Sequence, residues 1–204
     1  MLASTRDHVD PRVTRTRKLL IEAFLDLMAE KPFEAITVQD ITARATVNRA
    51  TFYAHFADKY ALVDDLIRDG FAQFLQQRLA HATGSGQAHL RRLFLAVTDH
   101  WTAINARCQQ SYRVFAPLVE AQVKAQLRES VREWLATWGA AGATAGQVDL
   151  LATIVSAGLY AAAMEWAQSP RNQTPEAFAD TAIPLIAASM TARSAEAAHE
   201  HTLR

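Results

Sequence analysis

The chain has 204 residues, half of them hydrophobic and 21% charged, and its formal net charge at pH 7 is zero. This composition is typical of a globular protein, and the length allows one large helical domain or a small domain joined to a larger one. Zero net charge excludes a strongly basic protein, so any nucleic-acid-binding surface must be local. The single cysteine, Cys108, excludes an intrachain disulfide and a multi-cysteine metal site, and we expect a cytoplasmic location.

Neither the N-terminal segment nor the longest apolar run points to a membrane. Residues 1–18 are polar and lack the apolar core region of a signal peptide. The longest apolar run, 150–164, is shorter than the roughly 20 residues that span a bilayer. We therefore expect this run to form a buried helix and expect no membrane partner.

In the N-terminal part, apolar residues recur at helical spacing. The apolar stripe of residues 19–28 predicts a first helix that ends before Pro32, since the residue before proline avoids helical backbone. Thr37 is suited to cap a second helix, Asn48 a short third helix and Asp58 a fourth helix. We therefore expect three helices followed by a longer one.

The rest of the chain continues the helical pattern after a glycine-rich linker at 84–86. The expected elements are a helix at 90–105, a short piece at 112–115, and helices at 117–138, 147–167 and from Pro175 onward. No alternating strand pattern and no internal repeat is present. The predicted fold class is all-α, with about nine helices in total.

The segment 37–56 carries the strongest functional signal. Two short helices joined by a tight turn at 46–48 predict a helix-turn-helix, whose second helix enters the DNA major groove. Arginine, glutamine and threonine side chains can contact base edges, and tyrosine, histidine and lysine suit phosphates. The apolar residues of this segment are expected to fold the pair onto the first helix; they are Val38, Ile41, Ala45, Val47, Phe52 and Phe56. The side chains left outward are Gln39, Arg49, Ala50, Thr51, Tyr53, Ala54 and His55.

Two further sets of basic residues fit this interpretation. Arg12, Arg15, Arg17 and Lys18 precede the predicted first helix, and they predict an arm that lies along the DNA backbone or in the minor groove. The alternative is a solvated tail. Lys59 stands at the start of the fourth helix, where a phosphate is favoured.

Residues 14–74 resemble the TetR/AcrR family of regulators. The resemblance is carried by 37–41 and 48–56, followed by Asp58 and Lys59. It implies that Tyr53, His55 and Lys59 contact the DNA backbone and that Gln39, Arg49, Ala50 and Thr51 contact bases or nearby phosphates. We count Thr37 and Asn48, which begin the two helices, among the candidate DNA-binding residues.

The resemblance departs from the family pattern at the turn. The family usually has glycine where this chain has Thr46. A β-branched residue is a poor choice for left-handed backbone, so the turn either avoids positive φ or is strained.

The resemblance also implies a domain organisation and a mode of action. We expect a flexible basic arm at 1–13, a TetR-type DNA-binding domain at 14–74 and a ligand-sensing and dimerisation domain at 75–204. The implied protein is a homodimeric, ligand-responsive repressor of a palindromic double-stranded operator.

The expected dimer interface lies on the last two helices, where small residues allow close helix packing. Its candidate residues are Leu151, Val155, Gly158, Leu159, Ala162, Ile186 and Met190. The alternative is that these residues form the core of one chain.

The expected effector pocket lies between C-terminal helices, where all four tryptophans fall. Arg113 suits an anionic effector, and Glu165 with the tryptophans suits a cationic one. The alternative is an ordinary aromatic core. The candidate pocket residues are Trp101, Tyr112, Arg113, Trp134, Trp138, Tyr160, Met164 and Glu165.

Other classes of protein find little support. The seven histidines form no spaced metal motif, and the chain has no phosphate-binding glycine loop and no nucleophile elbow, so we expect no enzyme, metal or cofactor. A helical protein-interaction module that no longer binds DNA remains an alternative. Cys108 is interpreted as a plain buried thiol, with a redox sensor as the alternative.

Overall fold

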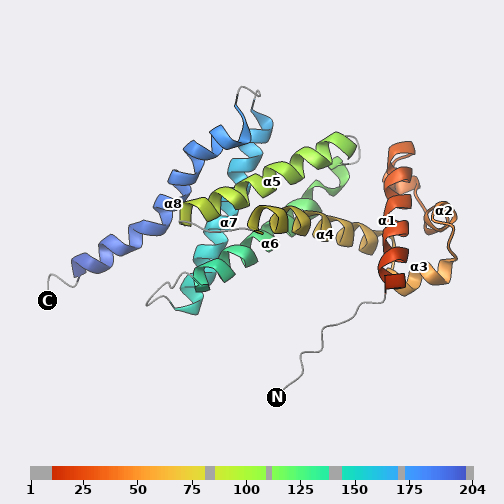
Figure 1. Cartoon of the computed structure of the whole chain (residues 1–204), viewed down its shortest axis with the longest axis horizontal. Helices are drawn as coiled ribbons and strands as arrows, with labels where there is room; N and C mark the ends of the chain where they lie inside the picture. The colour runs from red at the N-terminus through yellow and green to blue at the C-terminus, as the bar shows by residue number, and fades with distance from the viewer. Residues whose placement is uncertain (1–10, 81–85, 109–111, 138–143, 170–172, 201–204) are drawn as a thin grey trace, which may run out of the picture. The chain divides into compact units, whose positions relative to one another are not determined.

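The computed structural model describes residues 11–80, 86–108, 112–137, 144–169 and 173–200, without the side chains of 107–108, 112–113 and 189–200. Within these residues the fold has eight α-helices, one 3-10 helix and no strand (Figure 1), which confirms the all-α class. The elements are α1 (Pro11–Glu30), the 3-10 helix η1 (Phe33–Ala35), α2 (Val38–Arg44), α3 (Arg49–His55), α4 (Lys59–Leu79), α5 (Gly86–Cys108), α6 (Tyr112–Thr137), α7 (Ala145–Gln168) and α8 (Pro175–Glu200).

The sixth helix differs from the sequence-based expectation. A short piece at 112–115 and a separate helix from Pro117 were expected, but α6 runs unbroken from Tyr112 to Thr137 with Pro117 inside it. Pro117 lies in the second turn, where its missing N–H removes one backbone hydrogen bond near the helix end. The helix tolerates this loss, and the two predicted pieces become one element.

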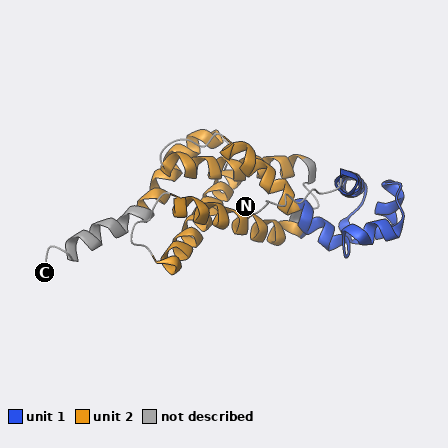
Figure 2. Ribbon diagram, turned by 60° about the horizontal axis from the view of Figure 1, so that its bottom comes forward, with its two compact units in different colours: residues 1–66, 107–114 blue, residues 67–106, 115–204 orange. Residues whose placement is uncertain are grey.

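The chain divides into two compact units, coloured separately in Figure 2. Unit 1 comprises 1–66 with 107–114, and unit 2 comprises 67–106 with 115–204. The division falls inside α4, the helix that also contains the predicted domain boundary after residue 74. Most of the predicted arm at 1–13 lies outside the described residues.

Unit 1 is built on the apolar stripe of α1. Leu20 and Phe24 are at most 1% exposed, as are Ile41 of α2 and Phe52 of α3. Helix α1 packs against α2, and α2 packs against α3. Phe33 of η1 closes this core by meeting the Phe24 ring edge-on, with 6.1 Å between ring centroids. The two short helices therefore depend on α1 for their stability, because helices of seven residues are marginal alone.

Unit 2 has its own core of helices. Phe94 of α5, Leu127 of α6 and Leu159 of α7 are completely buried. Helices α7 and α8 pack together, and the ring of Phe94 stacks on Phe178 of α8 at 6.0 Å. Each unit thus has a separate hydrophobic centre.

Helix α7 is the one described helix that is long and apolar enough to cross a membrane by length and composition. Such a test is also passed by the core helix of a globular protein. In unit 2 one side of α7 is buried, and its buried residues include Ala152, Val155 and Trp166. The expectation of a buried helix at 150–164 therefore holds for one side of α7, while the other side is exposed.

Candidate nucleic-acid interface

The start of α2 is set by a reciprocal cap. The Thr37 hydroxyl accepts a hydrogen bond from the backbone N–H of Asp40 at 3.1 Å, and an Asp40 carboxylate oxygen accepts from the Thr37 N–H at 2.8 Å. The cap expected at Thr37 is confirmed, and it takes the form of a capping box with Asp40. Lys31 lies 2.8 Å from the same Asp40 oxygen. This hydrogen bond from Lys31, followed by those from Thr37, holds the pKa of Asp40 well below its usual range.

The turn between α2 and α3 contains a residue with positive φ. Of the two outcomes expected for this turn, avoidance of positive φ or strain, the structure has the second. Thr46 has φ of 56°, the only positive φ among non-glycine residues in the described part of the chain. The N–H of Val47 donates to the carbonyl of Thr42 at 3.0 Å, and the N–H of Thr46 donates to that of Ala43 at 3.3 Å. These bonds form a Schellman motif, which requires left-handed backbone at the residue that follows the cap. The turn therefore keeps its geometry although glycine is absent.

Helix α3 is fixed at both ends. At its start, the Asn48 side-chain oxygen accepts from the Thr51 N–H at 2.7 Å and from the Thr51 hydroxyl at 2.9 Å. Phe52 is fully buried, and Phe56, which follows the helix, is 4% exposed. The cap and the two buried aromatic rings fix which side of α3 faces the core of unit 1.

Away from Phe52, the surface of α3 is exposed. Arg49, Ala50, Tyr53 and Ala54 lie there, and Tyr53 is 50% exposed. A guanidinium nitrogen of Arg49 lies 3.4 Å from the Tyr53 hydroxyl. Thr51 and His55 are half-buried at the edges of this face, and Gln39 is exposed on α2. The structure thus leaves every predicted α3 side chain at least partly accessible.

Lys59, a predicted phosphate contact, has different partners. Its ammonium nitrogen lies 2.8 Å from the Ile36 carbonyl oxygen, 2.9 Å from that of Phe33 and 3.3 Å from that of Glu34. It also lies 4.3 Å from the centre of the Phe33 ring. In this conformation the charge of Lys59 is directed into unit 1. Local sequence patterns give no signal for a contact across more than twenty positions.

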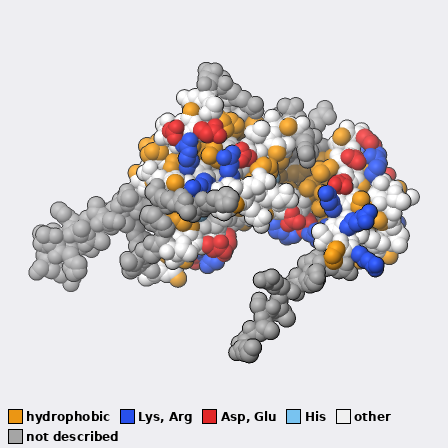
Figure 3. All heavy atoms as spheres, in the orientation of Figure 1, with side chains coloured by type: hydrophobic (Ala, Val, Ile, Leu, Met, Phe, Trp, Pro, Cys, Tyr) orange, Lys and Arg blue, Asp and Glu red, His pale blue; other side chains and the backbone are white. Residues whose placement is uncertain are grey.

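The basic cluster near the N-terminus was expected ahead of the first helix, but it lies within α1. Arg17 forms an ion pair with the buried Asp65, and its guanidinium lies 5.1 Å from the centre of the Phe56 ring. Arg15 and Lys18 are exposed. Figure 3 shows Lys and Arg side chains gathered on the visible face of unit 1, beside acidic ones. Pro11, the first described residue of α1, suits the first helical position.

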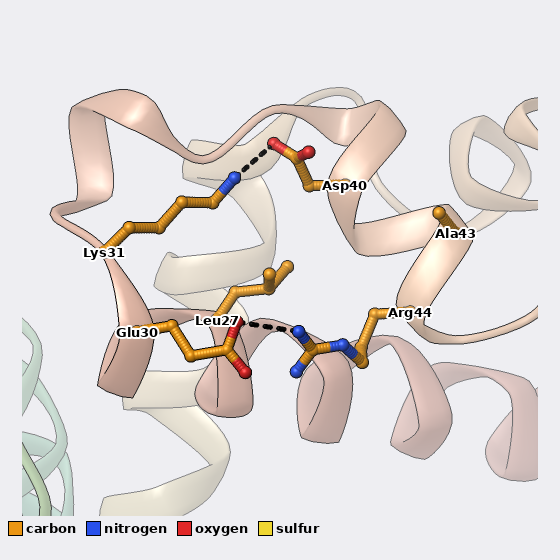
Figure 4. Close-up of a pocket in the computed structure, with 6 residues that line it drawn as sticks. All are labelled: Leu27, Glu30, Lys31, Asp40, Ala43 and Arg44. Atoms are coloured by element: carbon orange, nitrogen blue, oxygen red, sulfur yellow. Dashed lines mark hydrogen bonds and ion pairs between the residues drawn. The ribbon is translucent and has the colours of Figure 1, made fainter.

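A surface hollow of about 550 Å³ lies between the end of α1 and α2 (Figure 4). Two ion pairs cross it, Lys31 with Asp40 at 2.8 Å and Arg44 with Glu30 at 2.7 Å. The hydrogen bond from Arg44 lowers the pKa of Glu30. These pairs tie α2 to α1 across the hollow.

The predicted effector-pocket residues contact several different partners within unit 2. Trp101 meets Trp166 edge-on, Trp134 stacks on His89 with 5.0 Å between centroids, and Lys124 lies over the Tyr160 ring. Met164 is half-buried and Glu165 is exposed. Trp138 and the side chains of Tyr112 and Arg113 lie outside the described residues. Trp166 is one of the four tryptophans expected in this region, whereas His89 was not predicted as a partner.

The predicted dimer residues divide between the inside and the surface of unit 2. Val155 and Leu159 are fully buried within the chain, so they have no surface to offer a second copy. The position of a β-carbon on Gly158 would lie 3.7 Å from Ile186 of the same chain. Leu151 and Ala162 are half-buried, and the Met190 side chain is not described. Sequence alone could not orient α7, because apolar and small residues surround the whole helix.

Comparison with known proteins matches this architecture to a family. Residues 20–66, which run from α1 into α4, match the model of the bacterial regulatory proteins of the tetR family. This match assigns residues 20–66 to the TetR family. The TetR family is non-enzymatic. Within the described residues, no three His, Cys, Asp or Glu side chains are grouped to hold a metal.

Curated relatives of this TetR-family chain are similar over its N-terminal part. An uncharacterized HTH-type transcriptional regulator of Bacillus subtilis, YxbF, is 44% identical over 68 residues, 33% of this chain and 18% of YxbF. The HTH-type transcriptional repressor KstR2 of Mycobacterium tuberculosis is 34% identical over 93 residues, 44% of this chain and 46% of KstR2. The dhaKLM operon transcriptional activator DhaS of Lactococcus lactis is 33% identical over 60 residues, 29% of this chain and 32% of DhaS. The chain spans less than half the length of these relatives.

A solved structure extends the likeness to the whole fold. A TetR transcriptional regulator from Streptococcus agalactiae superposes with a TM-score of 0.55 at 19% identity, covering 86% of this chain and 95% of that one. At this identity the likeness establishes the fold alone. The C-terminal helices are therefore arranged in the same fold as in that structure.

Proposed function

We propose that this TetR-family chain is a DNA-binding transcription regulator and that it acts as a ligand-responsive repressor. The observation that carries the proposal is the exposure of Arg49, Ala50 and Tyr53 on α3, whose Phe52 is buried in unit 1. Helix α3 is the second of the pair, the element that enters the major groove in helix-turn-helix proteins. The family match over 20–66 supports this role.

The proposed contacts follow from side-chain chemistry. Arg49 is placed to donate to guanine in the major groove, and the Tyr53 hydroxyl to a phosphate oxygen. Gln39, Thr51 and His55 flank this centre. Ala50 permits close approach because its side chain is small. Thr37 and Asn48 contribute by holding the starts of α2 and α3, since their side-chain oxygens already accept backbone hydrogen bonds.

The test is a binding comparison with the DNA that flanks the chain's own gene. Arg49→Ala should lower discrimination at one base position by about 1–3 kcal/mol, and Tyr53→Phe should weaken binding to all sequences alike. Arg128→Ala is the matched control, because Arg128 is an exposed arginine on α6. If Arg49→Ala keeps the base preference of the unchanged protein, Arg49 does not contact a base. If no DNA binds even at low salt, the interaction-module alternative is favoured.

We propose that the protein acts as a two-fold dimer through the exposed side of α7 and α8. Leu150 and Ile154 of α7 are 61% and 50% exposed, and Leu185 of α8 is 72% exposed. Ala157 and Ala161 continue the same side of α7. An exposed apolar row on two packed helices is suited to bury itself against a second copy. A two-fold dimer would also present two α3 helices to a palindromic operator.

The regulatory direction and the effector are also proposals. KstR2 is named a repressor and DhaS an activator, so expression of a reporter under the bound promoter, with and without the protein, decides between them. We place the effector, a small molecule of apolar or aromatic character, among the aromatic residues of unit 2. Its binding would shift the population between a DNA-binding and a released conformation, which requires different affinities for the two. Such a regulator would reside in the cytoplasm with its DNA.

A further inference from the structure

Lys59 begins α4, and its ammonium group is enclosed by main-chain oxygens. The carbonyl oxygens of Phe33, Glu34 and Ile36 lie 2.9, 3.3 and 2.8 Å from its nitrogen. A lysine ammonium has three N–H donors and no acceptor. The three carbonyls therefore use all its donors, and we call this arrangement the Lys59 cage.

The carbonyls of the cage belong to one short segment with a defined place in the chain. Phe33 and Glu34 lie in η1, and Ile36 is its C-terminal cap, whose N–H donates to the Phe33 carbonyl at 3.1 Å. Helix ends leave carbonyl groups without helical partners, and a cation near them is favourable. The next residue, Thr37, caps α2. The cage thus joins the first residue of α4 to Ile36, the residue before the cap of α2.

Aromatic rings reinforce the cage from the side. The Lys59 ammonium lies 4.3 Å from the centre of the Phe33 ring and 5.7 Å from that of Tyr60. The two rings meet edge-on at 5.2 Å. Phe33 is 3% exposed, so one wall of the cage is anchored in the core of unit 1. A cation over such ring faces gains further electrostatic stabilisation.

We propose that Lys59 is a positioning residue for DNA binding, which holds the start of α2 against α4 and does not neutralise a phosphate. This inference rests on the proposed DNA-binding function. The two roles compete, because an ammonium that donates to a phosphate must withdraw donors from the cage. The segment 33–36 would then lose the cation that satisfies its carbonyls. Lys59 acts on DNA through α2 and the turn that follows it.

Two substitutions separate positioning from phosphate contact. Lys59→Met keeps a stem of similar length against Phe33 and removes the ammonium. Lys59→Arg keeps the charge, but its planar five-donor guanidinium does not match three converging carbonyls. The cage predicts that both variants lose affinity for the native DNA fragment, by about tenfold or more. A phosphate contact predicts that Lys59→Arg binds like the unchanged protein.

The salt dependence of binding gives a second, independent readout. Each phosphate neutralised adds about 0.9 to the slope of log K against log salt concentration. With the cage, Lys59→Met should lower affinity and leave this slope unchanged. A slope that falls by about one in Lys59→Met, with Lys59→Arg restoring it, overturns the proposal. Unchanged affinity in both variants overturns it as well.

Hydrogen exchange tests the cage without DNA, so failure of the proposed function cannot obscure it. In Lys59→Met, backbone amides from Ile36 to Asp40 should exchange faster, while amides of α5 keep their rates. Lys18→Met is the control, because Lys18 is an exposed lysine on α1. Equal exchange over 36–40 in all three proteins overturns the cage. If the unchanged protein binds no DNA but the exchange result appears, the cage stands and the regulator proposal fails.

Discussion

His100 makes the stability of unit 2 depend on pH. Its side chain on α5 is 5% exposed and lies against the rings of Phe71 and Phe74, with centroids 5.3 and 5.6 Å away. Its Nε2 atom has no hydrogen-bond partner among the described residues. Burial disfavours the charged imidazolium and lowers the pKa of His100 from 6.5 to about 4.

The sign of the effect follows from the two pKa values. Because the folded pKa is lower than the unfolded one, the unfolded chain binds more protons between pH 4 and 6.5. The stability is therefore complete above pH 6.5 and is lost as the pH falls toward the folded pKa. The loss from this one group is about 2 kcal/mol between pH 7 and pH 5, and it approaches about 3 kcal/mol below pH 4.

His100→Leu removes the titrating group and keeps an apolar side chain between the two rings. Urea unfolding followed by circular dichroism, at one protein concentration, gives the free energy of unfolding at pH 7 and pH 5. The unchanged protein should lose about 2 kcal/mol more than His100→Leu over this interval. Other titrating groups, including His89, are common to both proteins and cancel. Equal losses in the two proteins would show that folding does not hold His100 uncharged.

Three further substitutions test local parts of the structure. Thr46→Gly should raise the free energy of unfolding of unit 1 by about 1 kcal/mol, because glycine adopts positive φ without strain. A lower free energy of unfolding in urea would argue against a strained turn. Asn48→Ala should lower it by about 1 kcal/mol through loss of the α3 cap, and an unchanged melting temperature would contradict that role. If the proposed dimer forms, Ile154→Asp should convert it to a monomer in sedimentation, while Val114→Asp, similarly exposed on α6, should not. A dimer that survives Ile154→Asp would place the interface elsewhere.

The parts of the fold that depend on local chemistry were predictable from the sequence. Thr37 and Asn48 were identified as caps because their side chains reach a backbone N–H three residues on, and both caps are present. The spacing of apolar residues also identified Phe52 and Phe56 as the inward side of the helix-turn-helix. Thr46 was recognised as the point where turn geometry and residue type conflict.

The parts that depend on distant contacts were not predictable. Arg17 and Lys59 were expected to be available to DNA, but partners far along the chain engage both. For a long flexible side chain, the neighbouring sequence does not indicate which distant group its charged end contacts. Val155 and Leu159 were misplaced for another reason, because α7 is apolar on every side and periodicity cannot show which side is buried.

Sequence-specific DNA binding by the whole chain is the central claim. It is tested most directly by fluorescence anisotropy with the labelled intergenic DNA that flanks the chain's own gene, against scrambled DNA, over a salt series. The account predicts much tighter binding to the native fragment, weakening steeply with salt. No binding to either fragment at low salt would contradict the role assigned to the exposed face of α3.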